Sequence, residues 1–252
     1  MTRLSVNLNK IALLRNSRTL GIPSVTRAAV IALDAGAHGI TVHPRPDGRH
    51  IRVGDVHELA SLLKGRPDAE FNIEGNPFQG LLEIVQTVRP QQCTLVPDDP
   101  GALTSDHGWD IKRDGARLKP VIAKIRALGI RISLFMDPLP AAMPAVHGLG
   151  ADRVELYTEP YARAFASADE PKVIEGYASA ARAAQGAGLG VNAGHDLNQS
   201  NLPRFLASVP RVLEVSIGHA LVADALDTGL AQAVHNYLAA IARGSGGGMG
   251  LR

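Results

Sequence analysis

The feature that most constrains this chain is a regular alternation of short strand-like segments with longer helical ones. Eight short segments rich in β-formers lie at residues 5–9, 39–45, 70–74, 92–97, 131–137, 153–158, 190–195 and 213–219. Helical patterns lie at residues 25–35, 56–63, 78–88, 116–127, 141–146, 161–187, 202–208 and 221–242. Strands that alternate with helices form parallel βαβ units, and eight such strands close into a barrel. The alternation therefore predicts an α/β fold, a single (β/α)8 TIM barrel.

The alternation also predicts where the domain begins and ends. No linker-like stretch interrupts it, so we expect one barrel domain at residues 1–243 and a flexible glycine-rich tail at residues 244–252. The longest helical segment, 161–187, predicts an extra helix after the sixth strand. Five glycines precede strands and suit the left-handed position that ends a helix: Gly36, Gly65, Gly129, Gly150 and Gly188.

Composition excludes several classes of function. Lys and Arg number 26 against 24 Asp and Glu, a net charge of +2 that is too balanced for a nucleic-acid surface. Cys93 is the single cysteine, so no intrachain disulfide forms, and its apolar surroundings predict a packing role. The sequence shows no secretory signal and no apolar run long enough for a bilayer, so we expect a cytoplasmic protein without membrane association.

Polar residues gather at the C-terminal ends of the predicted strands, where barrel enzymes carry their active sites. Such groups are costly to bury without a partner, so the set as a whole predicts a site on this face of the barrel. Its members include Asn7, Asn9, Lys10, His43, Arg45, His50, Glu74, Glu155, His195, Asp196, Gly218 and His219, with Thr104 in the loop after the fourth strand.

Two glycine–histidine pairs, Gly194-His195 and Gly218-His219, fall in the loops after the seventh and eighth strands. These loops often bind phosphate in barrels, because glycine lets backbone N–H groups approach an anion. Glycines that only ease tight turns are the alternative, but the twin occurrence favours a phosphate site. Weaker candidates for a second phosphate site are Arg18, Arg45 and His50.

Four of the polar residues suit general acid–base catalysis, because carboxylates and imidazoles in a partly dry pocket have pKa values near neutrality. They are His43, Glu74, Glu155 and His195.

Two other chemistries fit the sequence less well. A metal-dependent barrel hydrolase usually begins with a His-x-His pair, whereas the first strand here carries Asn7-Leu8-Asn9. A Schiff-base aldolase needs a lysine inside the barrel, and Lys10 is the only lysine near a strand end. We therefore expect no metal site.

Motifs spread along the chain in order resemble the pyridoxine 5′-phosphate synthase family. They are VNLNKIALLRN at 6–16, GITVHPR at 39–45, RHI at 49–51, FNIE at 71–74, LVP at 95–97, VNAGH at 191–195 and IGH at 217–219. Together they run from the first predicted strand to the eighth, and the set is more specific than any one motif.

The resemblance implies that 3-amino-2-oxopropyl phosphate condenses with 1-deoxy-D-xylulose 5-phosphate to give pyridoxine 5′-phosphate, phosphate and water, with no cofactor. By position it implies that His43 and Glu74 accept protons, that His195 donates one and that Glu155 stabilises charge. It implies that the amino-ketone phosphate is held by Asn7, Asp196 (through its backbone), Gly218 and His219. It implies that the deoxyxylulose phosphate is held by Asn9, Lys10, Arg18, Arg45, His50 and Thr104.

The resemblance also implies a homo-octamer. Members of the family carry Asp-His where this chain has Asn9-Lys10, a change that exchanges a carboxylate for a cation and favours phosphate binding. Two alternatives stay open at this point: another barrel enzyme that acts as a sugar-phosphate epimerase or lyase, and a non-catalytic barrel that binds a phosphorylated metabolite.

Overall fold

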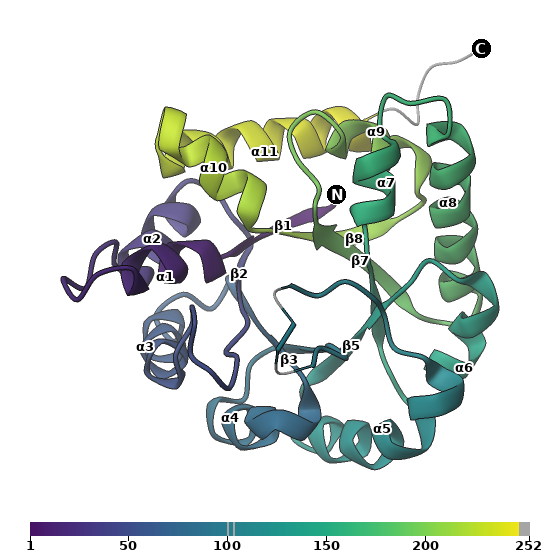
Figure 1. The fold of residues 1–252 in the computed structure, drawn as a ribbon, viewed down its shortest axis with the longest axis horizontal. Helices are drawn as coiled ribbons and strands as arrows, with labels where there is room; N and C mark the ends of the chain where they lie inside the picture. The colour runs from purple at the N-terminus through teal and green to yellow at the C-terminus, as the bar shows by residue number, and fades with distance from the viewer. Residues whose placement is uncertain (100, 103, 247–252) are drawn as a thin grey trace.

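Eight parallel strands form a closed barrel in chain order (Figure 1). The computed structural model describes residues 1–99, 101–102 and 104–246. The strands are β1 (Arg3–Asn7), β2 (Gly39–Val42), β3 (Glu70–Gly75), β4 (Gln92–Leu95), β5 (Arg131–Met136), β6 (Arg153–Leu156), β7 (Gly190–His195) and β8 (Val212–Ile217). Each strand pairs with the next, and β8 pairs with β1, so the sheet has no free edge. The predicted (β/α)8 barrel is confirmed.

Helices form an outer ring around the strands (Figure 1). They are α1 (Asn9–Asn16), α2 (Val25–Asp34), α3 (Val53–Leu63), α4 (Leu82–Val88), α5 (Ile111–Arg126), α6 (Met143–Gly148), α7 (Glu159–Ala164), α8 (Glu170–Gly186), α9 (Leu202–Ser208), α10 (His219–Thr228) and α11 (Leu230–Ser245). Two short turns, η1 (Pro77–Leu81) and η2 (Pro140–Ala142), precede α4 and α6.

The extra helix predicted after the sixth strand is present, because the segment 161–187 divides into α7 and α8. The division lies at Phe165, whose ψ of 134° is extended, and Ala166, whose φ is +61°. The last helical segment divides in the same way into α10 and α11, at Gly229 with φ +83°. The helix α1 was not predicted, because its eight residues contain only two buried apolar side chains, Ile11 and Ala12.

Most of the apolar core lies between the barrel and the helices. Every second residue of a strand points outward into this layer, as Leu4, Val6, Ile40 and Val42 do, and all four are fully buried. Cys93 of β4 belongs to the same layer, so its predicted packing role is confirmed. Burying one such side chain contributes about 1.5–3 kcal/mol, so this layer supplies the main drive to fold.

The interior of the barrel is polar. The hydroxyl groups of Ser5 and Thr41 are 2.6 Å apart, and Thr94 donates a hydrogen bond of 3.1 Å to Asn72. At the N-terminal end of the barrel, Arg153 of β6 forms an ion pair of 3.6 Å with Glu214 of β8. Buried Asn192 donates to Gln92 at 3.4 Å, while the buried hydroxyl of Ser133 has no partner among the described residues. Because buried polar groups need partners, this lining holds a second, hydrogen-bonded core inside the sheet.

The predicted left-handed conformation of Gly65 was wrong. Gly65 does not take the left-handed conformation seen at Gly36, Gly129, Gly150 and Gly188, because its N–H instead continues the right-handed turn and bonds the Leu62 carbonyl at 3.2 Å.

The predicted tail begins too early, since α11 continues to Ser245. Gly244 is buried against α9, where an added Cβ would lie 2.7 Å from the Pro203 carbonyl oxygen. The rest of the predicted tail, residues 247–252, lies outside the described residues. In the part of the chain that the structure covers, no helix has the length and apolar character that crossing a membrane requires.

Candidate active site

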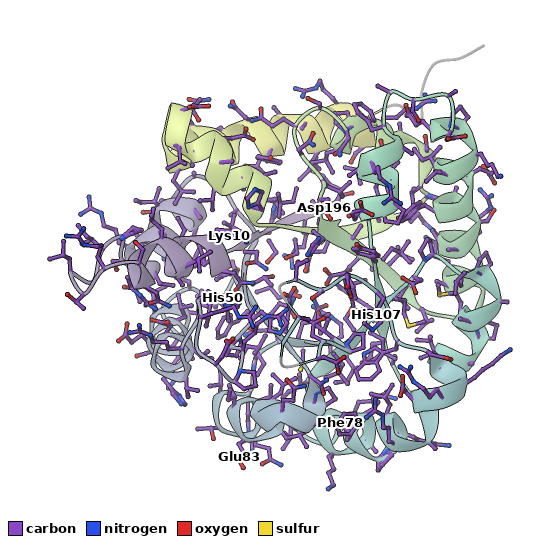
Figure 2. The ribbon with its side chains drawn as sticks, viewed as in Figure 1. Lys10, His50, Phe78, Glu83, His107 and Asp196 are labelled. Carbon is purple, nitrogen blue, oxygen red and sulfur yellow. The ribbon has the colours of Figure 1, made fainter. Side chains whose placement is uncertain are left out.

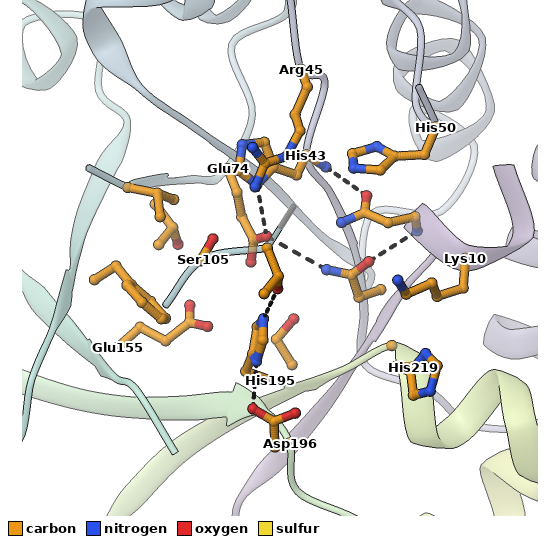
Figure 3. A pocket seen from close by; sticks show the side chains of 18 residues that line it. Lys10, His43, Arg45, His50, Glu74, Ser105, Glu155, His195, Asp196 and His219 are labelled. Carbon is orange, nitrogen blue, oxygen red and sulfur yellow. Dashed lines mark hydrogen bonds and ion pairs between the residues drawn. The ribbon is translucent and has the colours of Figure 1, made fainter. Parts of the chain in front are cut away.

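A cavity of about 330 Å³ opens at the C-terminal ends of the strands (Figure 3). It brings together nearly all of the site residues predicted from the sequence: Asn7, Asn9, Lys10, His43, Arg45, His50, Glu74, Thr104, Glu155, His195, Asp196, Gly218 and His219. Figure 2 shows that Lys10, His50 and Asp196 reach the barrel mouth from different parts of the chain. The convergence follows from the fold, because all parallel strands of a barrel end on one face.

Arg18 is the predicted residue that the structure does not bring to this cavity. It is exposed in the segment after α1, and its N–H bonds the Arg15 carbonyl at 3.4 Å. Neighbouring side chains tie this segment to the loop after β2: Arg15 pairs with Asp55, and Asn16 donates to the His50 carbonyl at 2.7 Å. The anchoring holds Arg18 on the outer surface of the chain.

The catalytic candidates His43 and Glu74 face each other at the mouths of β2 and β3. Nδ1 of His43 lies 3.9 Å from Oε2 of Glu74, and both residues are buried. Asn7 donates to the same Oε2 at 3.5 Å. The amide oxygen of Asn9 accepts the backbone N–H of His43 at 2.9 Å, so this asparagine positions the loop after β2.

Burial shifts the pKa values of His43 and Glu74 in opposite directions. Loss of water lowers the pKa of His43 well below its usual value, and Arg45 and His50 add to the effect. Loss of water raises the pKa of Glu74 well above its usual value, and the nearby carboxyl of Glu155 adds to the effect. His43 is therefore uncharged near neutral pH, and the surroundings of Glu74 favour its protonated form, so both groups are placed to exchange protons with a ligand.

Glu155 of β6 is the second buried carboxyl of the cavity. Burial, followed by repulsion from Glu214, raises its pKa to about 8. Among the described residues its Oε2 atom has no hydrogen-bond partner, and neither does the buried hydroxyl of Ser216. Both residues line the cavity, so these atoms are polar contacts left for a ligand.

His195 ends β7 and is bonded on both ring nitrogens (Figure 3). Its Nε2 lies 2.8 Å from the hydroxyl of Thr104, and its Nδ1 lies 2.6 Å from Oδ2 of Asp196. Thr104 belongs to the loop between β4 and α5, so this loop contacts the histidine across the cavity.

The loop after β2 supplies positive and neutral donors. Arg45 is buried and forms an ion pair with Asp98, while its other nitrogen donates to the Ala102 carbonyl at 3.0 Å. Nδ1 of His50 accepts the N–H of Ile51 at 2.9 Å. Burial and then Arg45 lower the pKa of His50 to about 4. His50 is therefore neutral near pH 7 and carries its proton on Nε2.

Two helices begin at the cavity. Helix α10 starts at His219 after Gly218 and has no side-chain cap. Helix α1 starts at Asn9, whose N–H donates to the side-chain oxygen of Asn7 at 2.9 Å. The free N–H groups of a helix N-terminus favour anions such as phosphate. At Gly218 an added Cβ would lie 3.1 Å from the Cβ of Asn7, so glycine keeps the backbone of this corner close to β1.

Four lining residues were missed by the sequence interpretation: Thr94, Val96, Ser105 and Phe135. The inward-facing parity of β4 and β5 could have indicated Thr94 and Phe135. Ser105 lies in a loop, and no pattern pointed to it. Within the described residues, no group of three or more His, Cys, Asp and Glu residues suits a metal ion.

Solved structures share the fold at low sequence identity. Tryptophan synthase from M. tuberculosis superposes with a TM-score of 0.61 at 11% identity, covering 96% of this chain and 93% of that chain. Phosphoribosyl anthranilate isomerase from Thermus thermophilus superposes with a TM-score of 0.57 at 14% identity, covering 96% of this chain and 98% of that chain. These similarities support the barrel architecture alone.

Curated relatives are far closer in sequence. Pyridoxine 5′-phosphate synthase of Albidiferax ferrireducens is 58% identical over 248 residues, covering 96% of this chain and 98% of the relative. The enzyme of the same name from Xanthomonas campestris is 57% identical over 251 residues, covering 97% and 98%. The family model described as pyridoxal phosphate biosynthesis protein PdxJ matches residues 4–243. The chain therefore belongs to the PdxJ family of pyridoxine 5′-phosphate synthases.

Proposed function

We propose that this cavity is where 3-amino-2-oxopropyl phosphate and 1-deoxy-D-xylulose 5-phosphate condense to pyridoxine 5′-phosphate, phosphate and water. One observation carries the proposal: a single cavity unites acid–base groups of shifted pKa with the uncapped N-terminus of α10 and a lysine. The substrate amine attacks the ketone of the other substrate and loses water, which forms an imine between the two substrates. No lysine of the enzyme enters that bond.

We assign the phosphate of the amino ketone to the N-terminus of α10. Gly218 and His219 offer backbone N–H groups there, and Asn7 and the backbone of Asp196 lie on the same side of the cavity. An anion at this position gains from the free N–H groups and from the helix dipole.

We assign the phosphate of deoxyxylulose to the side of the cavity formed by α1 and the loop after β2. The assigned residues are Asn9, Lys10, Arg45, His50 and Thr104. Arg18 lies on the outer surface of the single chain and is left out of this set. Holding both phosphates orients the two substrates and makes the condensation nearly unimolecular.

The acid–base groups then carry the proton transfers. Neutral His43 can accept a proton directly. A cationic amine beside Glu74 lowers the pKa of this carboxyl, because opposite charge favours the ionised form. Glu74 thus becomes the second acceptor once substrate is bound. A cationic imine likewise favours the ionised form of Glu155, which then stabilises that positive charge. His195 donates a proton to a departing oxygen.

The test is an incubation of the purified protein with both substrates, followed by detection of pyridoxine 5′-phosphate by mass and absorbance. Product should require both substrates, and Glu74→Gln should abolish turnover while inorganic phosphate still binds. No product from folded protein would contradict the proposal. Turnover of a single sugar phosphate would instead support an epimerase or lyase.

We also propose that the chain acts as a homo-octamer in the cytoplasm. Apolar side chains stand exposed on α1 and the segment after it, namely Leu13, Leu14, Leu20 and Ile22. A surface of this kind suits contact with another copy of the chain. Sedimentation velocity should give the mass of eight chains, and a monomer would contradict the assembly.

A further inference from the structure

The carboxylate of Asp196 lies directly behind the imidazole of His195 (Figure 3). Oδ2 of Asp196 and Nδ1 of His195 are 2.6 Å apart. The other ring nitrogen, Nε2, lies on the cavity side, 2.8 Å from the hydroxyl of Thr104. The ring of Tyr157 packs edge-on against the imidazole, with centroids 5.9 Å apart. The imidazole is thus held on one edge by a carboxylate and presents the other edge to the cavity.

The backbone conformation at the end of β7 fixes this orientation of His195. His195 has a φ of +53°, a conformation that non-glycine residues rarely adopt and that costs of order 1–3 kcal/mol. The residue before it is a glycine, where an added Cβ would lie 2.3 Å from the Ser216 carbonyl oxygen. This turn at the end of β7 directs the ring back over the barrel mouth.

The position of Asp196 is fixed from the other side. Its carbonyl accepts the side-chain amide of Asn201 at 3.3 Å, and Asn201 is 1% exposed. The buried hydroxyl of Tyr161 donates to the Asn201 carbonyl at 2.8 Å. These bonds tie the loop after β7 to α7, the extra helix after β6. The loop after β7 is therefore held by these bonds independently of the contact between Asp196 and His195.

We propose that the side chain of Asp196 is a positioning residue for His195. Its carboxylate accepts the Nδ1–H, selects the neutral tautomer with an unprotonated Nε2, and stabilises the imidazolium that forms when Nε2 gains a proton. Only Nε2 then exchanges protons: it takes one from the cavity and returns it to a departing oxygen, while the Nδ1 proton stays in place. This inference rests on the proposed function and adds a role that the backbone of Asp196 does not supply.

A second Asp–His pair in the chain provides a matched control. Nδ1 of His107 lies 2.6 Å from Oδ1 of Asp106, the same contact at the same distance. That pair is largely exposed, with 49% and 67% of its side-chain surfaces accessible, and neither residue lines the cavity. If an Asp–His contact mattered only as a surface ion pair, the two aspartates would respond alike.

The experiment compares Asp196→Asn, Asp196→Glu and Asp106→Asn with the wild type. Steady-state kinetics with both substrates give kcat and KM. Nitrogen NMR of 15N-histidine-labelled protein gives the tautomer of His195, assigned by its loss in His195→Gln. For Asp196→Asn we expect kcat to fall about 10²-fold with KM changed less than about twofold, because acid–base steps of this kind contribute about 10²–10⁴-fold. The NMR should show the proton on Nδ1 in the wild type and its redistribution to Nε2 in Asp196→Asn.

Asp196→Glu restores a carboxylate and should recover both the tautomer and most of kcat. Asp106→Asn should match the wild type. Wild-type kcat in Asp196→Asn, an Nε2–H tautomer in the wild type, or an equal loss in Asp106→Asn would each overturn the proposal. Inactive wild-type protein would refute the proposed function instead, and the tautomer measurement would still decide whether Asp196 orients His195.

Discussion

The substitution Glu155→Gln should stabilise the protein increasingly as the pH rises. Glu155 is 4% exposed, and its pKa lies at about 8 instead of the ordinary 4.5. Between these two values the folded chain keeps the proton on Glu155, while the unfolded chain has released it. Unfolding therefore releases a proton and becomes more favourable as the pH rises. Glutamine removes this dependence and keeps the size of the side chain.

The magnitude follows from the two pKa values. Each pKa unit corresponds to about 1.4 kcal/mol, so the free energy of unfolding lost to ionisation grows to about 5 kcal/mol at pH 8 and then levels off. The slope with pH isolates this effect, because the exchange of a carboxyl oxygen for an amide nitrogen adds a constant that does not vary with pH. The advantage of Glu155→Gln should thus increase by about 1.4 kcal/mol per pH unit.

Urea unfolding at one fixed protein concentration, repeated from about pH 5 to about pH 9, measures this difference. Glu175→Gln is the matched control, because Glu175 is exposed and hydrogen bonds from Arg182 hold its pKa below the ordinary value. The control should follow the wild type over this range. If the curves of Glu155→Gln and the wild type run parallel, Glu155 is not a buried acid with a raised pKa, and the electrostatic account of the cavity is wrong.

Three further substitutions test other parts of the structure. Gly194→Ala places a Cβ 2.3 Å from the Ser216 carbonyl oxygen and should lower the free energy of unfolding by about 1–3 kcal/mol; an unchanged urea midpoint would contradict the close approach of β7 and β8. Lys10→Met should raise the KM for deoxyxylulose phosphate about tenfold with little change in kcat, because a charged hydrogen bond contributes about 1.5–3 kcal/mol; equal KM values would place that phosphate elsewhere. Arg153→Met strands the carboxyl of Glu214 inside the barrel and should cost about 3–5 kcal/mol, and adding Glu214→Gln should recover much of the loss in urea unfolding.

The candidate site was largely predictable because the barrel imposes one rule on its sequence. A polar residue at the end of a parallel strand reaches the common catalytic face, whatever the distance along the chain. His43, Glu74, Glu155 and His195 obey this rule, and the structure places all four in one cavity. The rule fails for residues in loops: it suggested nothing about Ser105, and Arg18 proved to lie on the outer surface.

What the sequence by itself determined is the architecture and the side of the barrel that carries polar chemistry. The alternation of apolar and polar residues in the strands follows from a sheet with helices on one face and a hydrogen-bonded interior on the other. Local signals such as strand length, helix period and terminal glycines are enough for that pattern, because they act between residues that are near in the chain.

Only the tertiary structure decided the charge states and the pairing of the site. Glu155 has a raised pKa because the closed barrel removes water from it and places Glu214 nearby, and those residues are far apart in the sequence. The contact of Thr104 with His195 likewise joins two loops that the sequence separates widely. Desolvation and long-range contacts depend on the packed arrangement of all eight strands, and no local segment of the chain carries that information.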